Sequence, residues 1–100
     1  MFDEVYTLGV WRVKDGKQGE FVEAWQALGR YFTSLPHPPG SGTLLQSLDE
    51  PQQFCSFGPW RTHDDIREMR SQPETPTEIA KLMDLCEEGR PGTFRVVATA

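Results

Sequence analysis

The stretch QFCSFGPWRTHDDIREM, at residues 53–69, constrains the fold of this chain more than any other. It begins as an apolar segment typical of a strand, is interrupted by a Gly-Pro pair, and resumes with a helical pattern. Thr62 is a favourable N-cap, and the two aspartates that follow it would lie in the first turn, where the helix dipole favours negative charge. We therefore predict a strand that ends at Phe57, a junction that presents Trp60, and a helix to about Ser71 with Ile66 and Met69 facing inward.

Two regular elements are predicted before this stretch. Residues 4–14 predict a strand whose alternating faces are both largely apolar, so both faces should be covered, with Trp11 at the sheet or at a dimer interface. Residues 18–35 predict a helix that ends before Pro36. Gly29 weakens this helix and suggests close approach of a neighbouring backbone. The expected polar side of the helix includes Gln26 and Arg30, and its apolar stripe comprises Phe21, Trp25, Leu28 and Phe32.

The remaining segments predict three more elements and two free thiols. Residues 43–48 and 52–57 should form an antiparallel hairpin across the turn at 49–51. The sequence TPTE at residues 75–78 is a capping-box pattern that predicts a helix with Thr75 as N-cap, ending at Gly89. Its apolar stripe would be Ile79, Leu82, Met83 and Cys86. Pro91-Gly92 would then turn the chain into a last strand at residues 93–98.

The order strand, helix, strand, strand, helix pair, strand predicts an α+β fold. It is the ferredoxin-like βαββαβ arrangement, with a four-stranded antiparallel sheet and the helices on one face. The strands carry apolar side chains on both faces, so the face without helices also needs a cover. A second copy of the same sheet would supply it, and we expect a homodimer that pairs face to face into a dimeric α+β barrel.

Composition excludes several classes of function. The 100 residues predict one domain (1–100), and a formal net charge of −5 without a cluster of Lys or Arg argues against nucleic acid as a partner. No apolar run is long enough to cross a membrane. The start of the chain lacks the pattern of a signal peptide, so we expect a cytoplasmic protein. Cys55 and Cys86 favour buried free thiols over a redox pair, and the spacing of His37 and His63 predicts no metal site.

Candidate site residues gather around the central stretch. Trp60 is either a lid on the core or a wall of an apolar pocket that can donate its indole N–H. Arg61 and His63 flank it and could polarise a ligand oxygen, although both are also typical solvent-facing residues. His37, in the Pro/Gly-rich loop at 36–42, is either solvated or at a pocket mouth. We assign catalytic candidates Trp60, Arg61 and His63, and substrate-binding candidates Phe21, Trp25, Phe57 and Arg12.

A resemblance to a known family rests on four segments. These are the opening strand YTLGVWRVK, the segment DGKQGEF at residues 15–21, the sequence FCSFGPWRTHDDI around Trp60, and PGTFRV near the end. Together they resemble the antibiotic biosynthesis monooxygenase family of dimeric α+β barrels. The resemblance implies a pocket between sheet and helices in each subunit, with Trp60 matching the tryptophan of the family. It also implies cofactor-independent oxygenation of an aromatic, phenolic small molecule.

The chain departs from the haem-degrading branch of that family. That branch uses an asparagine in the first strand and a histidine in the helix after the tryptophan. This sequence contains no asparagine and has Met69 and Arg70 where the histidine would be expected. We therefore expect no cofactor. Two functions stay open: an oxygenase that binds, desolvates and orients an electron-rich aromatic substrate, and a non-catalytic small-molecule binder or stress-associated homodimer of the same fold. A cavity packed shut by Phe21, Trp25 and Phe57 would contradict the first.

Overall fold

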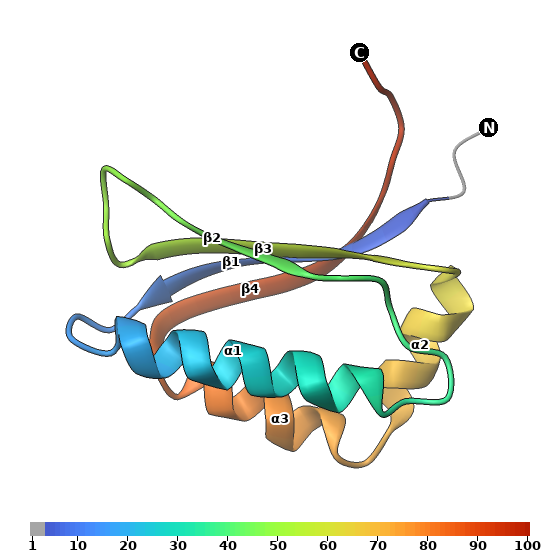
Figure 1. Cartoon of the computed structure of the whole chain (residues 1–100), viewed down its shortest axis with the longest axis horizontal. Coiled ribbons are helices and arrows are strands. Elements are labelled where there is room, and N and C mark those ends of the chain that lie inside the picture. The colour runs from blue at the N-terminus through green and yellow to red at the C-terminus, as the bar shows by residue number, and fades with distance from the viewer. Residues whose placement is uncertain (1–3) are drawn as a thin grey trace.

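A computed structural model describes residues 4–100 of the chain, so the part of the signal-peptide prediction that concerns residues 1–3 lies outside the described residues. The four strands form one antiparallel sheet in the order β2-β3-β1-β4. Figure 1 shows the helices together on one side of this sheet and an open side opposite them. In chain order the elements are β1 (Val5–Val13), α1 (Gln18–Thr33), β2 (Thr43–Gln46), β3 (Gln53–Trp60), α2 (His63–Ser71), α3 (Thr75–Met83) and β4 (Cys86–Arg95).

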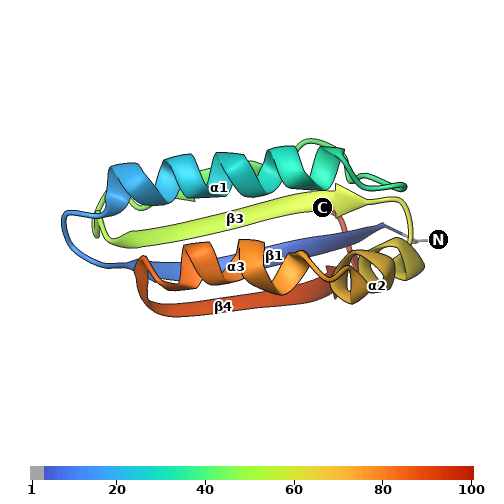
Figure 2. The ribbon, with the colours of Figure 1, turned by 90° about the horizontal axis from the view of Figure 1, so that it is seen from below.

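This arrangement confirms the predicted ferredoxin-like α+β fold with helices on one face. Figure 2 shows α1 and α3 running along the sheet, with α2 at one end. Within residues 4–100, no helix has the length and apolar character that crossing a membrane requires. The predicted N-cap of α2 is confirmed, because the side chain of Thr62 accepts a hydrogen bond from the backbone N–H of Asp65 (3.1 Å). Ile66 and Met69 are buried as expected.

The core lies between the sheet and the helices in two clusters. The larger contains Trp11, Phe21 and Phe54, whose rings stack at tilted angles, with centroids 5.8 and 5.1 Å apart along the row. The smaller surrounds Trp60, which meets Phe32 edge-on at 5.4 Å. Of the two expected placements of Trp11, at the sheet or at a dimer interface, the structure shows packing between the sheet and the helices. Alternation in β1 turns it to the same side as Val13, toward the helices.

The predicted interruption of β3 is wrong, because the strand continues through Gly58 and Pro59 to Trp60. β2 pairs with β3 only as far as Phe57, so beyond that residue β3 has a single neighbour, β1. Proline is tolerated where a strand has a side without a partner, since no ladder hydrogen bond is lost there. The backbone N–H of Gly40 donates to the Pro59 carbonyl (2.9 Å) and covers part of this edge.

The predicted boundary between the last helix and the last strand is also wrong. α3 ends at Met83, and β4 runs from Cys86 to Arg95 in place of residues 93–98. Gly89 and Pro91, expected in a helix stop and a turn, lie inside the strand. β4 pairs with β1 over nearly its whole length, and this pairing outweighs the local helical pattern. Because β4 is an edge strand, it also tolerates a proline.

Smaller differences concern element ends and one cap. α1 ends at Thr33 and β2 at Gln46, each two residues before the predicted end. Thr75 is the first helical residue of α3, not its N-cap. Its buried hydroxyl instead donates to the Met69 carbonyl (2.6 Å) and lies 2.8 Å from the hydroxyl of Tyr31, which links α1, α2 and α3. Cys55 and Cys86 are free thiols, and burial raises the pKa of Cys86, which sits at the start of β4.

The open face of the sheet is predominantly apolar. Alternation places on it every second residue of each strand, the set opposite the helix-facing side chains. Several of these side chains are exposed for their type, including Val10, Leu45 and Phe94. The apolar residues of this open face are Tyr6, Leu8, Val10, Leu45, Cys55, Phe57 and Phe94, and the polar residues Arg12, Thr43, Gln53, Glu88 and Arg90 share it.

Candidate functional site

A pocket of about 750 Å³ lies between the helix-facing side of the sheet and the three helices. Its size falls within the range of small-molecule sites. The loop after α1 closes part of it through Pro39, Gly40, Ser41 and Gly42. The principal side chains around it are Thr7, Trp11, Ser56, Trp60 and Thr93 from the sheet, Trp25, Gln26, Leu28, Arg30, Phe32 and Thr33 from α1, Met69 and Arg70 from α2, and Ile79 from α3.

Two tryptophans of the sheet are fixed in the pocket wall by hydroxyl groups, the buried one of Ser56 and the half-buried one of Thr7. The indole N–H of Trp60 donates to Thr7 Oγ1 (3.0 Å), and that of Trp11 donates to Ser56 Oγ (2.9 Å). Both indole donors are therefore engaged within the protein. A hydroxyl that accepts a hydrogen bond retains its own O–H as a donor. Polar recognition in the pocket interior accordingly falls to Thr7 and Ser56 rather than to Trp60.

One further hydroxyl in this wall has no partner. Thr93 lies directly across from Thr7 in the β1–β4 ladder, and its Oγ1 is buried without a hydrogen bond among the described residues. An unpaired buried hydroxyl costs about 1–3 kcal/mol. The pocket lining taken from residues 4–100 includes no Asp, Glu, His or Lys, so it offers hydroxyls and arginines but no ordinary general base.

The helix α1 contributes more to the pocket than its pattern indicated. Gln26 and Arg30, predicted on the outer side, both line the pocket. Gly29 does not mark the close approach of a neighbouring backbone, because a Cβ at this position would meet nothing within 4 Å. The missing side chain instead leaves open space beside Arg30, and Gly29 lines the pocket as well.

The seven predicted site residues are divided between different surroundings. Trp60 and Trp25 line the pocket from β3 and α1. Phe57 borders it only through its backbone, since alternation with the buried Phe54 turns its side chain to the open face. The cavity is thus not packed shut by aromatic side chains. The other substrate-binding candidates lie away from it: Phe21 is fully buried in the core, and Arg12 is an exposed partner of Glu50 and Glu87.

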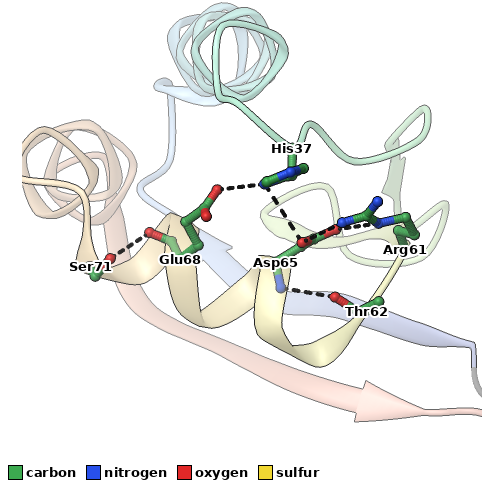
Figure 3. Close-up of polar contacts among 6 residues, drawn as sticks. All are labelled: His37, Arg61, Thr62, Asp65, Glu68 and Ser71. Atoms are coloured by element: carbon green, nitrogen blue, oxygen red, sulfur yellow. Dashed lines mark hydrogen bonds and ion pairs between the residues drawn. The ribbon is translucent and has the colours of Figure 1, made fainter.

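Arg61 and His63 lie at the start of α2, outside the pocket lining. His63 is exposed as the first residue of the helix. Arg61 pairs with the buried Asp65, with Nε 3.0 Å from Oδ2 and an Nη atom 3.2 Å from Oδ1 (Figure 3). On the other side of Asp65, His37 Nδ1 lies 3.9 Å from Oδ1 and 3.0 Å from Glu68 Oε1. This polar cluster joins the loop after α1 to α2.

Asp65 is expected to make the stability of the protein pH-dependent. The hydrogen bond from Arg61 lowers the pKa of Asp65, burial opposes this, and the charges of Arg61 and His37 lower it further. An unfolded aspartate titrates near about 3.9. Because the folded pKa is depressed, the stabilisation is present above that value and is lost as the pH falls through the folded pKa. Asp65→Asn should therefore lower the thermal midpoint at neutral pH, and the gap from wild type should close as the solution is acidified below about pH 4.

Asp64→Asn is the matched control for that measurement. Asp64 precedes Asp65 in the same turn, but its side chain is 82% exposed and pairs with the exposed Arg67. Exposed pairs contribute little to stability, and the effect of the helix dipole on an exposed carboxylate is small, so the midpoint of this variant should differ from wild type far less than that of Asp65→Asn. A midpoint difference for Asp65→Asn that stays constant down to pH 2 would show that the ionised carboxylate is not what stabilises the fold.

Sequence reasoning missed several residues of the pocket, above all Arg30, Arg70, Thr7 and Thr93. A weak indication existed in α1, where Gln26, Gly29, Arg30 and Thr33 recur at helical spacing beside the apolar stripe. The threonines could not be found in this way, because the pairing of Thr7 with Thr93 requires the register of β4.

The fold is similar to that of solved structures of antibiotic biosynthesis monooxygenases, as the sequence resemblance indicated. No known family profile matches the sequence, and no curated protein is similar to it by sequence. The similarity supports a monooxygenase at the level of the family.

Three solved structures show this similarity in fold. SnoaB, a cofactor-independent oxygenase from Streptomyces nogalater, superposes with a TM-score of 0.84 at 25% identity, over 97% of this chain and 96% of that one. A candidate antibiotic biosynthesis monooxygenase from Nitrosomonas europaea superposes with a TM-score of 0.78 at 19% identity, over 97% of this chain and 93% of that one. Another from Bordetella bronchiseptica superposes with a TM-score of 0.80 at 14% sequence identity, over 98% of this chain and 99% of that one. The structures from Nitrosomonas europaea and Bordetella bronchiseptica show the fold alone, because their sequence identities are low.

Proposed function

We propose that the protein is a cofactor-independent monooxygenase that oxidises an aromatic, phenolic small molecule in the pocket between sheet and helices. The observation that carries the proposal is the pocket of about 750 Å³ walled by Trp11, Trp25, Phe32 and Trp60, in a fold shared with SnoaB. Flat aromatic walls suit a planar aromatic ligand through stacking and edge contacts. The hydroxyls of Thr7 and Ser56 can orient a phenol or carbonyl oxygen of that ligand.

The reaction needs no external reductant. A ring CH₂ of an anthrone-type substrate becomes C=O by taking one atom of O₂, and the second oxygen atom leaves as water with the two hydrogens of that CH₂. Once it has ionised, the substrate supplies all four electrons that O₂ accepts, including the two that an external reductant would otherwise provide. The protein binds, desolvates and orients this anion. Since no carboxylate or histidine lines the pocket in residues 4–100, the substrate must be acidic enough to ionise with the help of nearby positive charge.

Oxygen uptake with anthrone tests this function. Wild-type protein should consume O₂ above the rate of the protein-free blank and yield anthraquinone with one O₂ per product. Trp60→Ala removes a pocket wall and should lower kcat/KM by roughly tenfold or more, because loosened positioning alone costs that much. Trp60→Phe keeps an aromatic wall but loses the indole N–H that donates to Thr7. Its kcat/KM should therefore lie between those of wild type and Trp60→Ala. Thermal midpoints of both variants separate loss of activity from loss of folding.

The absence of a base in the described lining favours the second function, a small-molecule binder. That protein would bind anthrone and anthraquinone, and lose binding in Trp60→Ala, yet consume no O₂ above the blank with any anthrone tried. Oxygen uptake that is unchanged in a folded Trp60→Ala variant would instead show that the chemistry does not occur in this pocket.

We also propose that the working unit is a homodimer that pairs through the open face. The face is apolar over its central strands, and Val10, Leu45 and Phe94 remain 39–53% exposed in the single chain. Such a continuous exposed patch marks an interaction surface. The C-terminal segment after β4 also stands out from the sheet on this side, where a second copy could contact it (Figure 1).

A further inference from the structure

Gly29 lies inside α1 at a position where neither backbone conformation nor capping requires a glycine. Inside a helix, glycine destabilises the protein relative to alanine, because it loses more conformational freedom on folding. The backbone at Gly29 is helical, and among the described glycines only Gly16 has a positive φ. The helix ends a full turn after Gly29, with Ser34 as its C-cap, so Gly29 does not terminate it.

Packing does not require the glycine either. A Cβ at Gly58 would lie 3.2 Å from the Cα of Gly42, closer than ordinary van der Waals contact, because two backbone segments pass each other there. A Cβ at Gly29 would meet no atom within 4 Å. Gly19, near the start of the same helix, has equally open surroundings, but it is exposed and does not line the pocket, whereas Gly29 does. The space at Gly29 therefore belongs to the pocket.

Two aromatic side chains flank this space along the helix. Trp25 precedes Gly29 by four residues and Phe32 follows it by three, which places all three on one side of α1, and all three line the pocket. Phe32 meets Trp60 edge-on, with ring centroids 5.4 Å apart. The ring of Trp25 lies beside Gly42, where a Cβ would be 3.3 Å from Cζ2 and Cη2. Both rings thus have protein neighbours, and position 29 between them carries no side chain.

We propose that Gly29 is a specificity-determining residue, because the ligand occupies the space that its missing side chain leaves between Trp25 and Phe32. An extended planar ligand gains contact area by reaching this space, whereas a compact ligand binds among the other walls without it. The size of residue 29 then sets how extended a ligand the pocket accepts. This inference rests on the proposed small-molecule function of the pocket.

The test compares a compact phenol with an extended one while residue 29 increases in size. Dissociation constants of 2-naphthol and of 1-hydroxypyrene are measured by quenching of tryptophan fluorescence, for wild type, Gly29→Ala and Gly29→Leu. Gly29→Leu should weaken binding of 1-hydroxypyrene roughly tenfold or more, since a side chain then fills occupied space, and should change binding of 2-naphthol by less than about twofold. Gly29→Ala should give a smaller loss of the same kind.

The stability of the ligand-free protein should change in the opposite direction. Gly29→Ala should raise the thermal midpoint by about 4–8 °C, because alanine favours the helix and its Cβ meets no neighbouring atom. A residue that serves only the fold would not gain stability while binding is lost. A lower midpoint for Gly29→Ala therefore overturns the inference, since the fold would then require the glycine.

Gly19→Ala is the matched control, because it adds the same methyl group to α1 outside the pocket lining. It should leave both dissociation constants unchanged. Unchanged binding of 1-hydroxypyrene by Gly29→Leu, or an equal loss for both phenols, overturns the inference and leaves the pocket function standing. A wild type that binds 2-naphthol but not 1-hydroxypyrene overturns it in the same way. If wild type binds neither phenol, the proposed function and this inference fall together.

Discussion

Phe94→Asp should convert the predicted homodimer into a monomer at micromolar concentration. Phe94 projects from the open face on β4, paired across the ladder with Tyr6, and is 53% exposed in the single chain. A carboxylate there would be buried without a partner when two apolar sheets meet, at a cost of several kcal/mol. The dissociation constant should rise by roughly a hundredfold or more, at about 1.4 kcal/mol per factor of ten. Sedimentation velocity over a concentration series measures this shift.

Leu48→Asp is the control for the dimer measurement. Leu48 is fully exposed in the connection between β2 and β3, outside the sheet ladder, so the same kind of substitution should leave the association unchanged. The monomeric Phe94→Asp chain should keep its helical circular dichroism, since little is buried at that position within one chain. A wild-type protein that sediments as a monomer at every concentration would contradict pairing through the open face.

Phe21→Ala should lower the free energy of unfolding by about 3–5 kcal/mol, the usual cost of removing a buried aromatic ring. Phe21 has no exposed surface, and it joins the rings of Trp11 and Phe54 between α1 and the sheet. The loss is a large fraction of the stability of about 5–15 kcal/mol of a typical domain. Urea denaturation at fixed protein concentration provides the measurement.

The same variant separates the core from the pocket. Phe21 was a substrate-binding candidate, but it does not line the pocket, whereas Trp25 does. The fraction of Phe21→Ala that remains folded should therefore bind an aromatic ligand as wild type does. Trp25→Ala should weaken binding with a smaller loss of stability, because Trp25 is only partly buried. If folded Phe21→Ala bound the ligand more weakly than Trp25→Ala does, Phe21 would have to be counted among the ligand-binding residues.

The sequence was informative where a local pattern and the tertiary structure agree. The stripe of α1 and the cap at Thr62 depend on neighbours within a few residues, so both could be predicted from spacing. The boundary between the last helix and the last strand, near Cys86, could not be predicted in this way, because residues 84–89 suit a solvent-exposed helix end as well as an edge strand. Only the ladder between β4 and the whole of β1 decides between them.

The site was harder to predict than the fold for the same reason. Trp60 could be placed because it sits at a strand end next to a helix cap. The nearby cations Arg61 and Arg12 were plausible from chain position, but each pairs with a carboxylate outside the pocket. The charged side chains that do line the pocket are Arg30 and Arg70, which are 40 positions apart in sequence and belong to one pocket only in the folded chain.

The packing around Trp11 also bears on how this sequence can diverge. A Cβ at Gly9 would lie 2.5 Å from the indole of Trp11, and one at Gly89 would lie 2.8 Å from it and 2.6 Å from Met83 Sδ. Real atoms do not approach so closely, so the ring occupies the space that both glycines leave. The residues at positions 9, 11 and 89 are therefore expected to change together during evolution. Descendants that keep a tryptophan at position 11 should keep both glycines, and those that lose it are free to acquire larger residues at 9 and 89.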